Sequence, residues 1–206
     1  MDKITLYYFL VAGKVTLARG ENVKLMLVDA GLDHEYVRVE RPEWPALKET
    51  LKKEKGAHSC TLPYIETNGQ CFFKTVPIMR YLSTRLEGKY HGSTPEDNQL
   101  LDVVAEVSDV WFDHLKNSFA GSDEVKANYA NNTLPAQIDM FEKYYADREG
   151  PYLLGEKLTY PDFLVYHMID DGGARDKLEG VAPNLVKFID AFEKRPNITQ
   201  YLKSLS

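Results

Sequence analysis

The sequence has few of the features that mark secreted or metal-binding chains. Its 206 residues include two cysteines, Cys60 and Cys71, and neither belongs to a Cys-x-x-Cys or Cys/His pattern. Such a pair implies neither a disulfide framework nor a zinc site, so we expect a reducing compartment and no metal. The chain also lacks a run of about eighteen apolar residues and an apolar leader, because its first residues run directly into a strand-like pattern. We therefore expect a cytoplasmic protein that neither spans nor binds a membrane.

Positive charge is scarce as well. The 25 lysines and arginines stand against 31 acids, which gives a formal net charge of −6, and the short basic run is Lys52, Lys53 and Lys55. This balance excludes nucleic acid and anionic membrane as the main partners. No internal repeat or low-complexity segment is present. What the chain does have is 44% hydrophobic and 12% aromatic content, enough to bury a substantial core.

Residues 60–82 are the most informative stretch. Asn68-Gly69 separates two short apolar runs and predicts a two-residue hairpin turn, because both central residues of the favoured turn need positive φ. Pro63 stands just before the first of these strands. A helix-spaced apolar set then follows Thr75, with Pro77 in the first turn, so we expect Thr75 to cap a helix. The strand pair would deliver the helix's unpaired N–H groups to one end of a sheet, where they attract carboxylates.

The first sixty residues predict a crossover unit. Ile4–Phe9 and Glu35–Val39 have strand patterns, and an apolar helical face extends from Val15 to Ala30, where Gly31 ends it. Strand, helix and strand at this spacing indicate a right-handed parallel crossover. The polar segment 40–61 is expected to be partly helical and exposed. With the hairpin and the capped helix, the order is β-α-β, a connecting loop, then β-β-α.

Beyond a polar linker at residues 87–96 the pattern becomes helical. One helix is expected from a cap at Thr94 or Asn98 through Leu115, and a second from 125 to 145 with Tyr144 on its inner side. Thr159 and Asp162 have the spacing of a capping box at the start of an apolar helix. Further helices are predicted at 183–194 and 196–205. The pattern therefore predicts a small α/β domain followed by an all-α domain.

Several segments together carry a resemblance to a known family. They are Leu6-Tyr7-Tyr8-Phe9 with Gly13, Arg38-Val39-Glu40 with residues 44–48, and residues 61–66, 75–82 and 155–163. In this order and spacing, over essentially the whole length, they resemble the tyrosine-using cytosolic glutathione S-transferases, the sigma, mu and pi group and sigma above all. The resemblance implies a thioredoxin-like glutathione-binding domain at residues 1–86. It also implies an all-helical domain at 87–206 that contributes to an electrophile pocket.

Tyr8 occupies the position that the resemblance makes catalytic. In that family the tyrosine hydroxyl donates a hydrogen bond to the glutathione sulfur and favours its thiolate. A free thiol has a pKa of about 8.5, and each unit of depression corresponds to about 1.4 kcal/mol in favour of the anion. The alternative for one of thirteen tyrosines is an aromatic strand residue packed in the core.

The resemblance assigns the remaining glutathione contacts position by position. Trp44 and Lys48 match side chains that flank the glycine end, Leu62-Pro63 resembles a cis-proline element, and Thr75 would hold the γ-glutamyl carboxylate. The implied set is Tyr8, Lys14, Trp44, Lys48, Thr61, Leu62, Pro63, Lys74, Thr75 and Asp109. Each assignment has an alternative that stays open: Trp44 as a loop anchor, Lys48 as a surface charge, Pro63 as a strand-entry proline and Thr75 as a structural cap.

The chain also departs from the family pattern. Lys74 stands where a glutamine or glutamate usually accepts from the γ-glutamyl ammonium, and a lysine has no acceptor. Val110 stands where many relatives have an acid, and Asp109 is one helical step of about 100° away. Ala12 replaces a frequent arginine, and the loop 48–61 is longer than in sigma relatives. The electrophile pocket implied by the resemblance comprises Phe9, Leu10, Val11, Trp111, Phe112 and Leu115, with Tyr201 and Leu202 as possible lids.

Two hypotheses for function follow. The first is a homodimeric detoxification enzyme that uses glutathione as co-substrate, activates its thiol through Tyr8 and conjugates it to small hydrophobic electrophiles. A glutathione-dependent isomerase, as among prostaglandin-making sigma relatives, is a narrower version. The second is a non-catalytic binding or structural module of the same fold, motivated by Lys74 and Val110. Cys60 suggests thiol transfer, but an inert small residue is the stronger interpretation.

Overall fold

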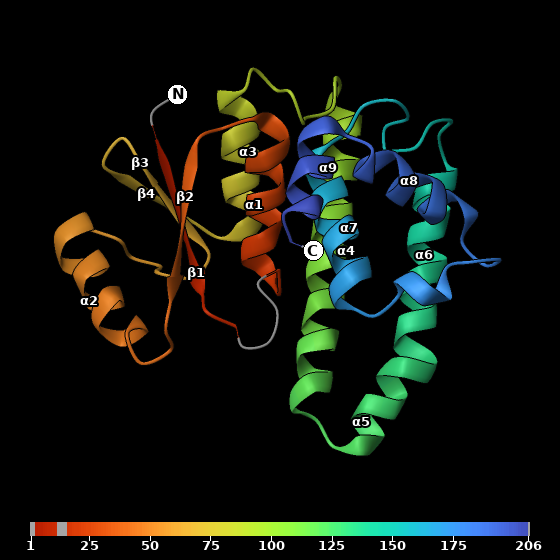
Figure 1. Ribbon diagram of the computed structural model, residues 1–206, viewed down its shortest axis with the longest axis horizontal. Helices are drawn as coiled ribbons and strands as arrows, with labels where there is room; N and C mark the ends of the chain where they lie inside the picture. The colour runs from red at the N-terminus through yellow and green to blue at the C-terminus, as the bar shows by residue number, and fades with distance from the viewer. Residues whose placement is uncertain (1–2, 12–15, 206) are drawn as a thin grey trace. The chain divides into compact units, whose positions relative to one another are not determined.

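The computed structural model describes residues 3–11 and 16–205, and the chain forms two compact units (Figure 1). The first unit comprises residues 1–85 and 196–206, and the second comprises residues 86–195. The domains expected from the sequence, 1–86 and 87–206, divide the chain at nearly the same point. They differ at the C-terminal end, where helix α9 (Pro196–Lys203) packs on α1 of the first unit.

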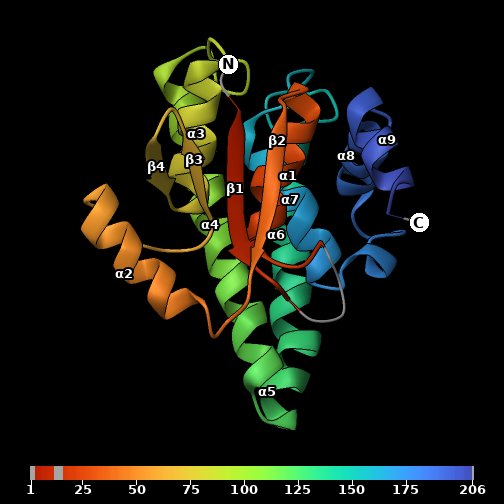
Figure 2. The same ribbon diagram turned by 60° about the vertical axis from the view of Figure 1, so that its left-hand side comes forward.

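The first unit is built on a four-stranded sheet in the order β2-β1-β3-β4 (Figure 2). Strand β1 (Ile4–Phe9) is parallel to β2 (His34–Val39) and antiparallel to β3 (Tyr64–Thr67), which pairs with β4 (Gln70–Phe73). Asn68 and Gly69 have φ angles of 53° and 71°, as the hairpin turn requires. The predicted crossover and hairpin are therefore confirmed.

Helices cover both faces of this sheet (Figure 1). On one face, α1 (Arg19–Ala30) and α3 (Thr75–Arg85) pack together, and α1 also contacts β1. Side chains on the other face, Tyr7 among them, pack with α2 (Trp44–Lys55). Gly31 ends α1 in the left-handed conformation, as predicted, and its N–H bonds to the Leu27 and Val28 carbonyls.

Two predicted helix starts were wrong. Helix α1 begins at Arg19 rather than near Val15, because Ala18 has a φ of 68° that no helix accommodates. Helix α3 begins at Thr75, so Thr75 is its first helical residue and not its cap. Lys74 precedes it with a φ of 71°, and the Lys74 carbonyl already accepts from the Ile78 N–H. The turn into α3 is thus made one residue earlier than the capping pattern suggested.

The second unit consists of helices packed around α7 (Tyr160–Asp171). The others are α4 (Pro95–Ala120), α5 (Asp123–Asn128), α6 (Leu134–Ala146) and α8 (Pro183–Glu193), with a 3-10 turn at Arg175–Lys177. Thr94 caps α4 by accepting from the Asp97 N–H. The helix predicted at 125–145 is interrupted by a π-helical turn, Tyr129–Thr133. Beyond this turn Tyr145, 2% exposed, faces the core in place of the predicted Tyr144.

Asp162 organises the start of α7, as the capping box predicted. Its carboxylate accepts from the Thr159 N–H and hydroxyl, the Leu153 N–H and the Tyr145 hydroxyl. Complete burial raises the pKa of Asp162 to about 6, although the four donors act in the opposite direction. Within the described ranges, 3–11 and 16–205, no helix is long and apolar enough to cross a bilayer.

Candidate functional site

The register of the sheet brings three predicted site segments to one edge. Tyr7 pairs with Tyr64, and Tyr64 pairs with Phe73. The carboxyl end of β1, which carries Tyr8, therefore lies level with the start of β3, just after Leu62-Pro63. It is also level with the end of β4, which continues directly into Lys74 and the first turn of α3. Segments more than fifty residues apart in the sequence meet here because the strand pairing fixes where each strand ends.

Tyr8 is a buried residue on the α1 side of the sheet. It is 7% exposed and shares that side with Ile4 and Leu6. Helix α1 lies directly on its ring, since a Cβ added at Gly20 would come within 2.6 Å of Tyr8 Cγ. Tyr8 is thus firmly packed, as we would expect of an aromatic core residue of the strand. It also lies at the edge where the other site segments converge.

The Leu62-Pro63 peptide bond is cis, as the resemblance implied. On either side of this element the structure buries hydroxyls without partners. Thr61 Oγ1 and Thr75 Oγ1 are both buried and have no hydrogen-bond partner within the described part of the chain. Buried polar groups are usually hydrogen-bonded. Together with the unpaired N–H groups at the start of α3, these hydroxyls are available to a polar ligand.

Trp44 and Lys48 project from one face of α2, because they are four residues apart. The Trp44 ring packs edge-to-face on Phe9, with ring centroids 6.1 Å apart, and also packs against a cluster of Leu51, Cys60 and Tyr64. Lys48 is half-buried. The Phe9 contact links the start of α2 to the carboxyl end of β1, where Tyr8 lies.

The other predicted residues of the first unit are more exposed or lie outside the description. Lys74 is exposed at the start of α3, Leu10 is 50% exposed, and Phe9 and Val11 are half-buried. Lys14, Ala12 and Gly13 lie outside the described residues. Of the possible lids, Tyr201 donates to a Glu21 carboxylate oxygen on α1. Tyr201 therefore anchors α9 to α1.

The thiols occupy packed positions. Cys60 is 7% exposed, and its Sγ lies 3.6 Å from the Ala57 carbonyl oxygen. Burial raises the pKa of the Cys71 thiol, which disfavours the reactive thiolate. The buried position of Cys60 favours its interpretation as an inert core residue.

Predicted residues of the second unit differ widely in exposure. Asp109 is half-buried, whereas Val110 is 51% exposed. Trp111 is fully buried, donates through Nε1 to the Tyr129 hydroxyl at 3.0 Å, and packs on Phe141. It is a core residue of this unit, which is the common role of an aromatic residue at helical spacing. Phe112 is half-buried.

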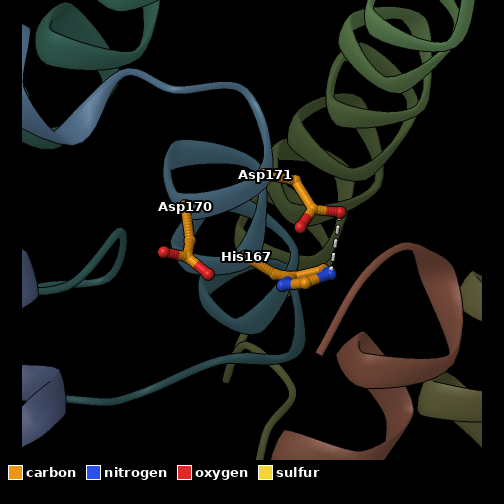
Figure 3. Close-up of side chains that lie close together, drawn as sticks. All are labelled: His167, Asp170 and Asp171. Atoms are coloured by element: carbon orange, nitrogen blue, oxygen red, sulfur yellow. Dashed lines mark ion pairs between the residues drawn. The ribbon is translucent and has the colours of Figure 1, made fainter. Parts of the chain in front are cut away.

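Leu115 lines a cavity of about 380 Å³ in the second unit. This volume lies in the range of small-molecule sites. The other lining residues are Ser118, Phe119, Lys126, Tyr129, Asp171, Gly172 and Gly173. Apart from Leu115, the sequence did not point to any of them, because they come from helix ends that only the fold brings together. The sequence signal that could have pointed to Asp171 is its spacing from His167, four residues earlier on the helix 160–171 (Figure 3).

Comparison with known proteins agrees with the fold. Residues 106–205 match the family model described as "Glutathione S-transferase, C-terminal domain". The chain is 29% identical to glutathione S-transferase P 10 of Caenorhabditis elegans, covering 96% of this chain and 90% of the relative. It is 28% identical to glutathione S-transferase P 1 of Xenopus laevis, covering 99% and 93%. The pi-class glutathione S-transferase of Onchocerca volvulus has the same fold, with a TM-score of 0.83 at 21% identity, covering 98% and 92%.

The chain is therefore similar over almost its whole length to glutathione S-transferases of the pi class, and mu-class relatives match it as well. The expected fold, an α/β unit with a helical unit, is confirmed. These relatives are named as enzymes, which favours the first hypothesis over a non-catalytic module.

Proposed function

We propose that the chain binds glutathione at the edge formed by the ends of β1, β3 and β4, and that Tyr8 activates its thiol. The observation that carries this proposal is the convergence of Tyr8, the cis Leu62-Pro63 bond and the buried hydroxyls of Thr61 and Thr75. A hydrogen bond from Tyr8 to the sulfur stabilises the thiolate, the nucleophilic form.

The γ-glutamyl end of the peptide binds at the start of α3 in this proposal. Its carboxylate accepts from the first N–H groups of α3 and from the Thr75 hydroxyl. Lys74 cannot accept from the γ-glutamyl ammonium, and its exposed cation instead adds positive charge beside the carboxylate. Trp44 and Lys48 contact the glycine end, and Lys14 and Asp109 complete the proposed set.

The reaction is a nucleophilic addition or substitution at an electrophilic carbon. With a chloronitrobenzene, the sulfur–carbon bond forms at the ring carbon that bears chlorine, and chloride then leaves with the bonding electron pair. The thiol proton passes to solvent. Phe9, Leu10, Val11, Phe112 and Leu115 are the residues proposed to contact such a small hydrophobic substrate, and the core position of Trp111 limits it to an indirect role.

The test compares two neighbouring tyrosines. Tyr8→Phe removes the hydroxyl that we propose donates a hydrogen bond to the glutathione sulfur. The kcat for a chloronitrobenzene is expected to fall about 100-fold, with little change in glutathione affinity. Tyr7→Phe is the matched control, because Tyr7 lies on the opposite face of β1, stacked on Tyr64 at 4.3 Å. It should retain most activity. Unchanged turnover in Tyr8→Phe, or an equal loss in Tyr7→Phe, would contradict the proposal.

Two narrower features remain predictions. A glutathione-dependent isomerase activity would appear as an isomer, and not a conjugate, in product analysis by mass spectrometry. A homodimer would sediment at twice the chain mass of 23.5 kDa, or about 47 kDa.

A further inference from the structure

The start of helix α3 carries charge of one sign. Lys74, which directly precedes the helix, is exposed, and the sequence of α3 contains two arginines and no acid. Strand β4, which leads into Lys74, contains no charged residue. The N–H groups of the first turn add the positive end of the helix dipole. Residues 70–85 therefore attract anions and offer no carboxylate to a cation.

Thr75 adds a buried hydrogen-bonding group at the same place. It is 4% exposed, and its Oγ1 has no hydrogen-bond partner within the described part of the chain. The Thr61 hydroxyl, next to the cis Leu62-Pro63 bond, is likewise buried and without a partner among the described residues. Because a buried hydroxyl is costly without a partner, these groups favour a ligand oxygen at the start of α3. A carboxylate meets this requirement.

The ammonium group of glutathione is less well served by this site. In an α-amino acid the ammonium and the carboxylate are bonded to the same carbon, so binding one brings the other close to it. An ammonium is stabilised by acceptors and by negative charge. The segments that meet at this edge, 8–11, 61–64 and 73–76, contain no acid. Lys74 has three donors and no acceptor.

The acid on the neighbouring strand is already engaged. Glu66 of β3 accepts from Lys55 Nζ through Oε1 at 2.7 Å. The register pairs Glu66 with Cys71, three residues before Lys74, so Glu66 does not lie at the end of β4. An ammonium bound at the start of α3 would therefore meet the Lys74 cation without a compensating acid from the strands or helix that form this edge.

We infer that the start of α3 selects thiol peptides whose terminal carboxylate has no ammonium beside it. Glutaryl-cysteinylglycine, which is glutathione without its α-amino group, then binds more tightly than glutathione itself. The inference rests on the proposed function, in which the γ-glutamyl end binds here, and it names the class of thiol co-substrate. Lys74 is the specificity residue and takes no part in bond formation.

The exposure of Lys74 sets the size of the effect. Water screens a charge at the surface, so the repulsion between the ligand ammonium and Lys74 amounts to about a fivefold difference in Kd. Salt should reduce this difference further, because the screening length is only about 3 Å at 1 M. A preference that arises from charge is thus distinguished from one that arises from shape, which salt leaves unchanged.

Calorimetric titration with the two peptides at low salt tests the inference. Wild type should bind glutaryl-cysteinylglycine with a Kd about fivefold lower than that of glutathione. Lys74→Met removes the charge and should remove most of this preference. Lys74→Gln supplies an amide oxygen that accepts from the ammonium and should reverse the preference. Lys53→Met, which removes an exposed lysine of α2, is the matched control and should keep it.

The outcomes separate the inference from the proposed function. Equal affinities in wild type, or tighter binding of glutathione, overturn the inference and leave the proposed function intact. Tighter binding of glutathione would mean that an acid, Asp109 among the candidates, holds the ammonium. An unchanged preference in Lys74→Met also overturns the inference.

Two further results complete the test. If the Lys74 variants do not fold, wild type still decides, because a preference that is the same at low and high salt overturns the inference. The predicted preference without conjugation of a chloronitrobenzene by either peptide would support the inference and contradict the catalytic part of the proposed function. Binding of neither peptide would overturn both.

Discussion

Gly20 shows how a single residue fixes the position of Tyr8. A Cβ at this position would meet the Tyr8 ring at 2.6 Å and come still closer to the Tyr36 hydroxyl. No L-side chain fits there without moving α1 or the strand. The close approach of α1 to β1, and with it the packing of Tyr8, depends on this glycine.

We therefore predict that Gly20→Ala destabilises the protein by about 1–3 kcal/mol, the usual cost of overpacking. Conjugation should fall more than global stability would explain, because Tyr8 is displaced. Urea denaturation and initial rates at a temperature where the variant is folded measure the two effects. Gly69→Ala, at a turn where an added Cβ meets nothing within 4 Å, is the control for glycine removal, although its φ of 71° adds local strain. A fully active, equally stable Gly20→Ala protein would contradict the packing account.

Asp162 makes a pH-dependent contribution to the free energy of unfolding. Burial raises its pKa to about 6 from the ordinary 3.8, so the folded protein binds a proton that the unfolded chain releases. The resulting stabilisation is present below pH 3.8 and is lost as pH rises through 6. The stability gap between wild type and Asp162→Asn should thus narrow by on the order of 2 kcal/mol between pH 4 and pH 7. Urea denaturation at several pH values measures it, and a gap that widens with pH would refute this assignment.

At the scale of single residues, the sequence predicted the conformation of those that a local sequence pattern marks. The hairpin residues Asn68 and Gly69 and the cap at Thr159 follow from neighbours in the chain, whereas the cis proline was implied by the family resemblance. The cavity beside Leu115 could not be predicted, because Leu115 and Tyr129 reach it only through helix packing. Lys74 and Ala18 also escaped prediction, since positive φ at these residue types has no sequence signal.

At the scale of elements, helix α9 is attached to the first unit by polar contacts. The Tyr201 hydroxyl donates to the buried Glu21 carboxylate of α1, and Asn197 donates to the Asp29 carbonyl at 3.2 Å. Burial and the neighbouring Glu21 carboxylate together raise the pKa of Tyr201. These bonds explain why a helix at the end of the chain belongs to the unit formed by its beginning.

Tyr201→Phe removes that donor and should lower the free energy of unfolding by about 1–3 kcal/mol. It should also accelerate amide hydrogen exchange in α9 more than in α7. Tyr144→Phe is the control, because the half-buried Tyr144 has no hydrogen bond within the described part of the chain. Equal exchange in α9 of wild type and Tyr201→Phe would show that the contact contributes nothing.

Most elements could be predicted because their apolar periodicity is strong. The interrupted helix at 125–145 is the informative exception: the periodicity covers all of it, yet Tyr129 begins a π-helical turn. Beyond this turn Leu134, Ile138 and Phe141 are buried as predicted, and the next core position is Tyr145, four residues after Phe141, in place of Tyr144. Tyr129 itself is fixed by its bonds to Trp111 and Gly172, which local sequence does not reveal.

For the whole molecule, the order of strands and helices, with the family segments, was sufficient to predict the fold. The sequence could not predict that α9 belongs to the first unit, because this depends on contacts between the two ends of the chain. Candidate site residues positioned by strand ends, Tyr8, Leu62-Pro63 and Thr75, meet at one edge of the sheet as the sequence led us to expect. It was less well predicted on helices, where Trp111 is a core residue and the cavity beside Leu115 includes unexpected groups.

The central claim is that Tyr8 lowers the pKa of bound glutathione. A pH titration of thiolate absorbance at saturating glutathione measures this pKa in wild type and in Tyr8→Phe. A free thiol has a pKa of about 8.5. Our account predicts a pKa at least about one unit lower in wild type and a value near 8.5 in Tyr8→Phe, with glutathione still bound. The same pKa in both proteins would contradict it.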